Sequence, residues 1–170
     1  QTDTTVKVLI VTAHPDDDAL FSGTVYKITH DLGGKVDLCL VTNGEGGYKY
    51  STLGESIYGL ELTDEEVGRK YLPEIRKKEL EAGCAIVGIK NFFYLNQKDH
   101  RYTTNVKEIM DSTVWDITFV KKRLKEIIEA GKYNYIFCLI PVPTTHAHHA
   151  SASILALTVV NELPLETRPV

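Results

Sequence analysis

Short runs of β-branched and other apolar residues alternate along the chain with longer segments whose apolar positions recur every three or four residues. The short runs predict four strands, at residues 6–12, 36–42, 91–95 and 135–140. The longer segments predict four helices, at residues 16–31, 63–87, 118–129 and 150–161. Strands that alternate with helices are typical of a doubly wound, mostly parallel sheet, so the predicted fold class is α/β.

Turn and capping residues set the expected ends of these elements. Asp16 or Asp17 is predicted to cap the first helix, because a carboxylate accepts hydrogen bonds from the free N–H groups there. Thr63 is predicted to cap the second helix, since a glutamate follows three positions later, as in a capping box. Pro73 is expected to kink or restart that helix. The segment 43–62 is predicted to be a long loop.

The size and charge of the chain narrow its class. Its 170 residues favour a single domain, large enough to fold without disulfides. The formal net charge is −4, so no basic surface indicates a nucleic-acid or anionic-membrane partner. No apolar stretch approaches the ~20 residues that a membrane-spanning helix needs. Cys39, Cys84 and Cys138 form no CxxC pair and are expected to be free, buried thiols.

The two ends of the chain leave its extent and its compartment open. The chain begins at Gln1 and not at Met, which fits removal of a signal peptide or an artificial start. A cytoplasmic and an exported location therefore both remain open. Pro169 and Val170 resemble the start of a further strand. We therefore expect residues 1–170 to form one domain that lacks its C-terminal part.

Two clusters of metal-binding residue types follow two of the predicted strands. The stretch 14–18, His-Pro-Asp-Asp-Asp, comes directly after the strand at 6–12, and the stretch 146–149, His-Ala-His-His, follows the strand at 135–140. The carboxyl ends of parallel strands lie at one edge of the sheet, where open α/β folds build their sites. The two clusters therefore predict one metal site assembled across the sheet.

The residue types in these clusters fit a catalytic zinc, which takes three His, Asp or Glu ligands and keeps an open position for water. His14 and Asp17 lie three residues apart across the strand-to-helix turn, and His149 can supply the third ligand. Asp16, beside a ligand, is then the candidate general base. His146 is a candidate acid or oxyanion-stabilising group. Two histidines and one aspartate also accept other divalent ions.

Each of these residues has a purely structural alternative. The aspartates can simply favour a helix N-terminus, where a negative charge stabilises by about 0.3–1 kcal/mol. His14 can be a hydrogen-bonded core histidine, and the histidines at 146–149 can form a surface tract. The joint occurrence of both clusters at strand ends favours the metal site. A nucleotide-binding Rossmann domain is disfavoured, because no GxGxxG motif follows the first strand.

Four segments resemble the motifs of one known family, and the resemblance spans residues 6 to about 160. They are Ala13-His14-Pro15-Asp16-Asp17-Asp18, Thr42-Asn43-Gly44-Glu45-Gly46-Gly47, Arg76-Lys77-Lys78-Glu79 and His146-Ala147-His148-His149. The first resembles the AHPDDE signature of the LmbE-like (PIG-L-type) zinc-dependent de-N-acetylases. The other three are similar to that family's TNGE-type segment, RxxE helix and HPDH motif. The resemblance implies a Rossmann-like sheet in three αβα layers.

The resemblance also implies an activity and roles for individual residues. The implied activity is hydrolysis of N-acetyl groups from an amino sugar or glycoconjugate that contains N-acetylglucosamine, or from a related small molecule. The implied roles fall into three sets, with His14, Asp17 and His149 as zinc ligands, Asp16, His146 and Arg76 as catalytic residues, and Arg76, Asn43 and Glu45 as substrate-binding residues.

The chain departs from the family pattern at three positions. Asp18 replaces a Glu, Ala147 replaces a Pro, and His148 replaces the Asp of HPDH. The resemblance places Asp18 and His148 just outside the metal ligands. A neutral histidine cannot supply the negative charge of the family Asp, so another carboxylate substitutes, His148 joins the ligands, or activity is reduced. A non-catalytic sugar- or metal-binding domain of the same origin is therefore the alternative function.

The segment 43–62 carries three tyrosines, Tyr48, Tyr50 and Tyr58. They are expected either to stack on a sugar or to pack this segment onto the body of the domain, because tyrosine commonly buries its ring while its hydroxyl stays accessible. The identity of the substrate and the oligomeric state, a homo-oligomer included, stay open.

Overall fold

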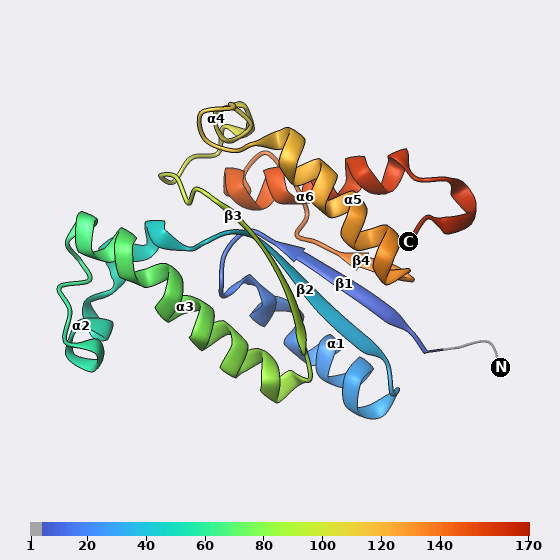
Figure 1. Ribbon diagram of the computed structural model, residues 1–170, viewed down its shortest axis with the longest axis horizontal. Coiled ribbons are helices and arrows are strands. Elements are labelled where there is room, and N and C mark those ends of the chain that lie inside the picture. Colours follow the sequence, from blue (N-terminus) through green and yellow to red (C-terminus); the bar gives the residue numbers. More distant parts are fainter. Residues whose placement is uncertain (1–4) are drawn as a thin grey trace.

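The structure is a computed structural model that describes residues 5–170 (Figure 1). Its sheet has four strands, β1 (Lys7–Thr12), β2 (Lys35–Thr42), β3 (Asn91–Gln97) and β4 (Tyr135–Phe137), in the order β3-β2-β1-β4. All three strand pairings are parallel. The predicted parallel α/β fold is therefore confirmed.

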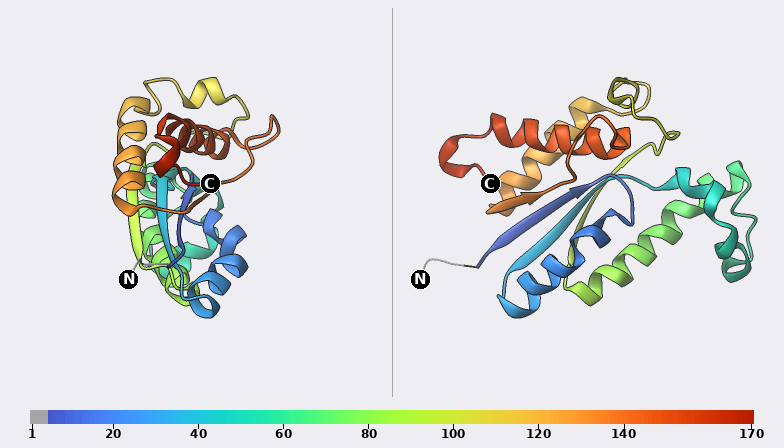
Figure 2. Two further views of the ribbon diagram at one scale, coloured as in Figure 1. Left: turned by 90° about the vertical axis from the view of Figure 1, so that its right-hand side faces the viewer. Right: turned by 180° about the vertical axis from the view of Figure 1, so that it is seen from behind.

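Helices cover both faces of the sheet and give three αβα layers (Figures 1 and 2). One layer holds α1 (Ser22–Tyr26) and the long α3 (Glu65–Val87). The opposite layer holds α5 (Ile117–Gly131) and α6 (Ala147–Glu162). β1 pairs with β2 on one side and with β4 on the other, so the chain extends the sheet from β1 toward both of its edges. This is the doubly wound arrangement that the alternation of strands and helices predicts.

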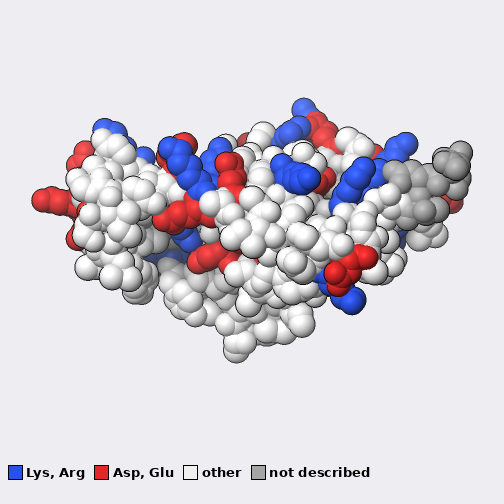
Figure 3. Space-filling model, turned by 90° about the horizontal axis from the view of Figure 1, so that it is seen from below, with Lys and Arg blue, Asp and Glu red and all other residues white. Residues whose placement is uncertain are grey.

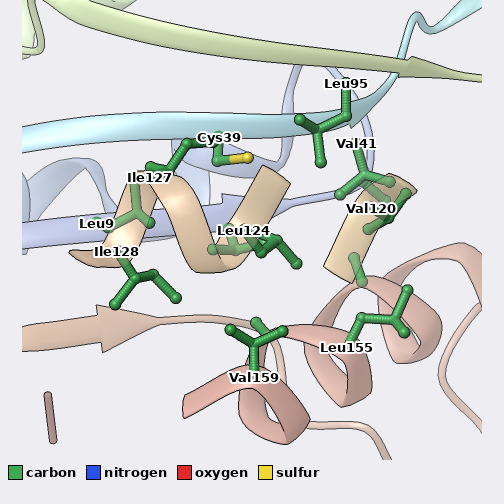
Figure 4. Close-up of a cluster of buried hydrophobic side chains, with 14 of the residues drawn as sticks. Leu9, Cys39, Val41, Leu95, Val120, Leu124, Ile127, Ile128, Leu155 and Val159 are labelled. Atoms are coloured by element: carbon green, nitrogen blue, oxygen red, sulfur yellow. The ribbon is translucent and has the colours of Figure 1, made fainter. Parts of the chain in front are cut away.

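The core divides into two clusters because successive strand residues face opposite sides of the sheet. In β1, Val8 and Ile10 pack toward α1 and α3, whereas Leu9 and Val11 pack toward α5 and α6. Figure 4 shows side chains of β1, β2, α5 and α6 meeting in the second cluster. Leu124 of α5 lies fully buried there.

Truncating Leu124 to alanine is expected to lower the free energy of unfolding by ~2–5 kcal/mol, because the lost side chain leaves a cavity in this cluster. Urea unfolding followed by circular dichroism measures the change. The matched control is Lys125→Ala in the same helix, since Lys125 is about half exposed and makes only a long ion pair with Glu129. A loss for Leu124→Ala no larger than that of the control would contradict the packing described here.

The helix predicted at 16–31 differs from the observed structure. Asp17–Phe21 forms a 3-10 turn (η1), α1 follows it, and Lys27–Asp31 forms a π-helical turn (η2). The predicted capping by Asp16 is wrong, because its side chain makes no capping hydrogen bond. The side chain of Asp17 does not cap the turn either, since its carboxylate faces back toward the end of β1.

The predicted loop at 43–62 contains two short helices, η3 (Glu45–Tyr50) and α2 (Thr52–Tyr58). The N-cap of α3 is Asp64 and not Thr63, because the Asp64 carboxylate accepts from the N–H groups of the next helical turn. Thr63 instead donates its hydroxyl to Glu55. Two further short helices, α4 (Val106–Ile109) and η4 (Leu165–Thr167), were not predicted.

Three more boundaries differ from the prediction. The restart expected at Pro73 is wrong, because α3 continues through this residue. Proline has no N–H to donate to the helix ladder, and the expected kink stays a prediction. The strand at 135–140 is shorter, since the chain leaves the sheet after Phe137 and Ile140 is exposed. Helix α6 begins at Ala147, earlier than predicted, which places two histidines of the second cluster in its first turn.

Beyond η4, the backbone of Val170 lies along the outer edge of β4. Its N–H donates to the Asn134 carbonyl, and the Ile136 N–H donates to its carbonyl, each at 2.9 Å. This is the pattern of a parallel bridge.

The surface carries mixed charge. Figure 3 shows basic and acidic side chains interspersed on the face seen from below. Among residues 5–170, no helix combines the length and the apolar character that crossing a membrane requires. Cys39 and Cys84 are buried free thiols as predicted, whereas Cys138 is partly exposed.

Candidate active site

A cavity of about 610 Å³ opens at the carboxyl edge of the sheet, next to the end of β1. The chain runs from β1 to β2 on one side and returns to β4 on the other side, so β1 marks the switch point of the strand order. The cavity is lined by the segments that follow β1, β2 and β3, by helix α3 and by the start of α6. Open α/β sheets bind ligands at such a switch point. Both predicted histidine and aspartate clusters lie here, so they form one site.

His14, Asp17 and His149 meet in this cavity. The His14 Nδ1 and His149 Nε2 atoms are 2.9 Å apart, and His149 Nε2 lies 3.1 Å from Asp17 Oδ1. One ligand atom from each of the three residues lies within 4.8 Å of the other two. The structure therefore brings together the three residues named in the sequence analysis as ligands.

The position of Asp17 follows from the turn after β1. Its Oδ2 atom accepts the backbone N–H groups of Ala13 and His14, at 3.0 and 2.8 Å. These two bonds hold the carboxylate in place and leave Oδ1 directed at His149. Asp17 is almost fully buried, so the turn gives it a single orientation.

The donor set of these three residues fits a divalent metal ion. Two imidazole nitrogens and one carboxylate oxygen converge, which is the ligand chemistry of catalytic zinc sites with one open position. One ring nitrogen from each of His14, His146 and His148 also lies within 4.8 Å of the other two. This second group shares His14 with the first group and contains no carboxylate. The first group is therefore the better match for zinc.

Asp16 lies beside the three candidate ligands but points toward α3. Its Oδ2 atom is 3.3 Å from Arg76 Nη2, and its side chain is 71% exposed. Arg76 Nη1 donates to the Gly44 carbonyl at 2.9 Å. Gly44 has a φ of +74°, and a Cβ there would lie 2.7 Å from Pro15 and 2.9 Å from Arg76. Only glycine therefore allows this contact between the segment after β2 and the segment after β1.

His146 occupies the N-cap position of α6, and its ring accepts a backbone hydrogen bond. Its Nδ1 atom accepts the N–H of His148 at 3.1 Å. A neutral imidazole that accepts at Nδ1 carries its proton on Nε2. Because His146 lines the cavity, this Nε2–H is available as a hydrogen-bond donor.

Asn43 and Glu45 are placed in the segment after β2. The Asn43 side chain accepts the N–H of Glu45 and donates to its carboxylate, so the two close a turn. Glu45 also lies 3.4 Å from Arg69 of α3, which lines the cavity. Asn43 lines a separate, smaller hollow of about 190 Å³. Direct substrate contact by either residue stays a prediction.

Asp18 ties the first turn after β1 to α3. Its Oδ2 atom accepts the thiol hydrogen of Cys84 at 3.4 Å, and burial raises the pKa of this carboxyl. Of the three tyrosines, Tyr48 is buried and packs with Leu62, although it also lines the cavity. Tyr50 is 90% exposed on the cavity rim, and Tyr58 donates its hydroxyl to an acidic residue of α3.

One further carboxylate of the site, Asp99, was not predicted from the sequence. It is 5% exposed, and its Oδ1 atom lies 3.4 Å from His14 Nε2 and 3.6 Å from His148 Nδ1. Its Oδ2 atom accepts the N–H of Gly46 at 3.0 Å. The signal was present, because Asp99 follows the strand at 91–95 as His14 follows the strand at 6–12.

The charges of the site shift the pKa values of its residues. Burial penalises the charged form of His14, but the hydrogen bond and charge of Asp99 outweigh this and raise its pKa. Burial likewise opposes ionisation of Asp17 and Asp99, yet the neighbouring imidazoles lower both pKa values. Burial, followed by repulsion from His14, lowers the pKa of His146 to about 4 and that of His148 to about 3. Both residues are therefore neutral near pH 7.

The fold and the site define a class of proteins: Rossmann-like α/β domains with a histidine–carboxylate centre at the carboxyl edge of a parallel sheet. Within this class, the chain belongs to the PIG-L family. The model of that family, described as GlcNAc-PI de-N-acetylase, matches residues 9–160. The family resemblance of the sequence motifs is thereby confirmed, and the chain is a member of a deacetylase family.

A curated relative and solved structures agree with this assignment. The chain is 28% identical over 163 residues to a probable N-acetyl-alpha-D-glucosaminyl L-malate deacetylase 2 of Bacillus cereus, and the match covers 96% of this chain and 64% of the relative. It is 26% identical to the N,N'-diacetylchitobiose deacetylase of Pyrococcus horikoshii, with a TM-score of 0.69 over 97% of this chain and 53% of that one.

The same fold also occurs in a protein with another named activity. A 4-carboxy-2-hydroxymuconate hydratase of Pseudomonas putida superposes with a TM-score of 0.70 at 14% identity, over 97% of this chain and 60% of that one. This likeness shows the fold alone. The chain spans less than two thirds of the length of each of these three proteins.

Proposed function

We propose that this chain is a zinc-dependent hydrolase that removes the acetyl group from a small molecule containing N-acetylglucosamine. The observation that carries the proposal is the convergence of His14, Asp17 and His149 in one cavity that Asp16 and His146 also line. Family membership and the names of two relatives support an amino-sugar amide as the substrate.

His14, Asp17 and His149 would hold the metal ion. When bound, a zinc ion lowers the pKa of a water ligand to about 7 and polarises a carbonyl oxygen. The protein prepares this position in two ways. Backbone N–H groups fix the Asp17 carboxylate, and His149 Nε2 lies within 3.1 Å of both Asp17 Oδ1 and His14 Nδ1.

Asp16 is the proposed general base. It takes a proton from the attacking water as the water oxygen bonds to the carbonyl carbon, and that proton passes to the amine nitrogen when the C–N bond breaks. The products are acetate and a free amine. Arg76 holds Asp16 at 3.3 Å, and Asp16 remains exposed enough to reach a substrate in the cavity. Arg76 is therefore proposed to orient the base and to contact the substrate.

His146 is the proposed stabiliser of the oxygen that becomes negative during attack. Its Nδ1 atom is occupied by the N–H of His148, so its Nε2–H is the donor available to the cavity. A neutral donor that is already aligned costs no reorganisation during the reaction. Asn43 and Glu45 are proposed to act on the substrate side of the cavity through Arg69, which Glu45 contacts.

The test is hydrolysis by the purified chain, with zinc content measured in the same sample. About one zinc per chain together with zinc-dependent release of acetate from N-acetylglucosamine conjugates is the expected result. Other divalent ions are compared by adding each back to chelator-treated protein. Zinc binding without release of acetate would instead favour the alternative, a sugar- or metal-binding domain, for which the His148 departure is the supporting observation. No zinc binding would refute the proposal.

The role of His146 can be separated from its role as a helix cap. The variant His146→Asn keeps an acceptor for the His148 N–H but removes the Nε2–H donor. We expect kcat to fall by ~10²- to 10³-fold, as for loss of one oxyanion donor, while zinc content and thermal stability stay unchanged. A variant with full kcat would rule out this role for His146.

A further inference from the structure

Asp99 is a buried carboxylate beside His14, and its two oxygens face N–H groups and imidazole nitrogens. Oδ2 accepts the Gly46 N–H at 3.0 Å. Oδ1 faces two imidazole nitrogens, His14 Nε2 at 3.4 Å and His148 Nδ1 at 3.6 Å. His14 therefore faces Asp99 with its Nε2 atom, and it faces His149 and Asp17 with its Nδ1 atom.

The hydrogen bonds of His148 show which of its ring nitrogens carries the proton. His148 is fully buried, and its Nε2 atom accepts the backbone N–H of His100 at 3.2 Å. A neutral imidazole that accepts at Nε2 is protonated at Nδ1. The Nδ1–H of His148 is therefore directed at the space between His14 Nε2, 3.2 Å away, and Asp99.

For a neutral His14 ring, the form that can bind a metal ion, two arrangements of protons fit these positions. In the first, His14 Nε2 accepts from His148, and the proton of His14 then lies on Nδ1, where it blocks metal binding. In the second, both His14 Nε2–H and His148 Nδ1–H point at Asp99 Oδ1, and His14 Nδ1 is left unprotonated. A negatively charged acceptor between two N–H groups favours the second arrangement.

We propose that Asp99 is a positioning residue that holds His14 in the tautomer whose metal-facing nitrogen is free, while His148 directs a second N–H toward the same carboxylate from 3.6 Å. The proposal deepens the proposed function and rests on its metal site. It also gives a role to the unusual residue at 148. His148 supplies a hydrogen-bond donor and no charge, while the negative charge next to the ligand histidine comes from Asp99.

The chain fixes Asp99 from several sides. The indole N–H of Trp115 donates to the Lys98 carbonyl at 2.9 Å, and Arg69 donates to the Asp99 carbonyl at 3.1 Å. Gly46 allows the close approach, because a Cβ there would lie 2.8 Å from the Asp99 carboxyl carbon. A side chain at position 46 would therefore displace the carboxylate from His14.

The test is the variant Asp99→Asn, which keeps the shape of the side chain and removes its charge. Zinc affinity, measured by competition with a chromophoric chelator, is expected to fall ~10- to 100-fold, the usual cost of losing a partner of a metal-bound histidine. Two-dimensional ¹H–¹⁵N spectra of the zinc-free protein are expected to show His14 protonated at Nε2 in the wild type. They are expected to show a mixture of tautomers in the variant, with the His14 signals assigned by their absence in His14→Gln.

The matched control is Asp37→Asn, which removes a partly buried carboxylate of β2 that accepts hydrogen bonds from Tyr133 and Asn91. It should leave zinc affinity and the His14 signals unchanged. If Asp99→Asn does not fold, Gly46→Ala displaces the same carboxylate without changing charge, with Gly83→Ala as its control because nothing lies near that position.

Unchanged zinc affinity and an unchanged His14 tautomer in folded Asp99→Asn or Gly46→Ala would overturn the proposal. Neither measurement needs turnover, so a failure of the Asp99 proposal can be told apart from a failure of the proposed hydrolysis. A wild-type chain that binds no zinc but whose His14 tautomer depends on Asp99 would refute the metal site and support the positioning role.

Discussion

Replacing Asp16 with asparagine is expected to lower kcat for acetate release by ~10²- to 10⁴-fold while the bound zinc stays unchanged. Asparagine keeps the size of the side chain but cannot take a proton from water. Asp16 lies outside the group His14, Asp17 and His149, and its near partner is Arg76, so metal binding should not depend on its charge. Steady-state kinetics on an N-acetylglucosamine conjugate, with metal analysis of the same sample, measure both quantities.

The control for this variant is Asp31→Asn, which removes another exposed, ion-paired carboxylate, here paired with Lys27 far from the cavity. It should leave kcat unchanged. Two results would count against Asp16 as the base. One is a kcat for Asp16→Asn within a few-fold of the wild type, and the other is a loss of zinc in parallel with activity, which would make Asp16 a ligand.

Replacing His149 with alanine is expected to abolish both zinc binding and hydrolysis. His149 contributes one of the three converging ligand atoms and also contacts both others, at 2.9 Å from His14 and 3.1 Å from Asp17. The loss of zinc affinity should therefore exceed the ~10- to 100-fold that removal of a residue behind a ligand costs.

Thermal unfolding gives an independent measure of this effect. Zinc at 100 times its Kd should stabilise the wild-type chain by about 2.7 kcal/mol, because it binds the folded state, and it should not stabilise His149→Ala. The control is His30→Ala, since His30 stacks on Tyr26 away from the site. Stabilisation of His149→Ala by zinc equal to that of the wild type would show that the metal binds elsewhere.

The hydratase with the same fold shows why the site, and not the sheet, must carry the functional conclusion. Its TM-score is as high as that of the chitobiose deacetylase. The sheet order only determines where a site forms, at the carboxyl edge beside β1. Which reaction occurs there depends on the side chains that line the cavity. The substitutions of Asp16, His146 and His149 change these side chains and leave the sheet intact.

Much of the fold was predictable from the sequence, because a parallel strand covered on both faces is a continuous apolar run. β1 and β2 were predicted to within one residue of their observed ends. The segment 43–62 was wrongly predicted as a loop, since η3 and α2 are too short to show a helical repeat. Their positions depend on tertiary packing, for example of Tyr48 against Gly68, where a Cβ would lie 2.4 Å from the tyrosine.

The sequence by itself determined that two clusters rich in histidine and aspartate follow two parallel strands, which was enough to bring His14, Asp17 and His149 to one edge. The family resemblance already implied that Arg76 contacts the acidic motif or the substrate. Only the tertiary structure showed that its partner is Asp16 and that Asp99 lies behind His14. The physical reason is that these contacts join segments far apart in the chain. Their side chains meet only once the strand order, the shift in register between β2 and β3, and the packing of α3 are fixed.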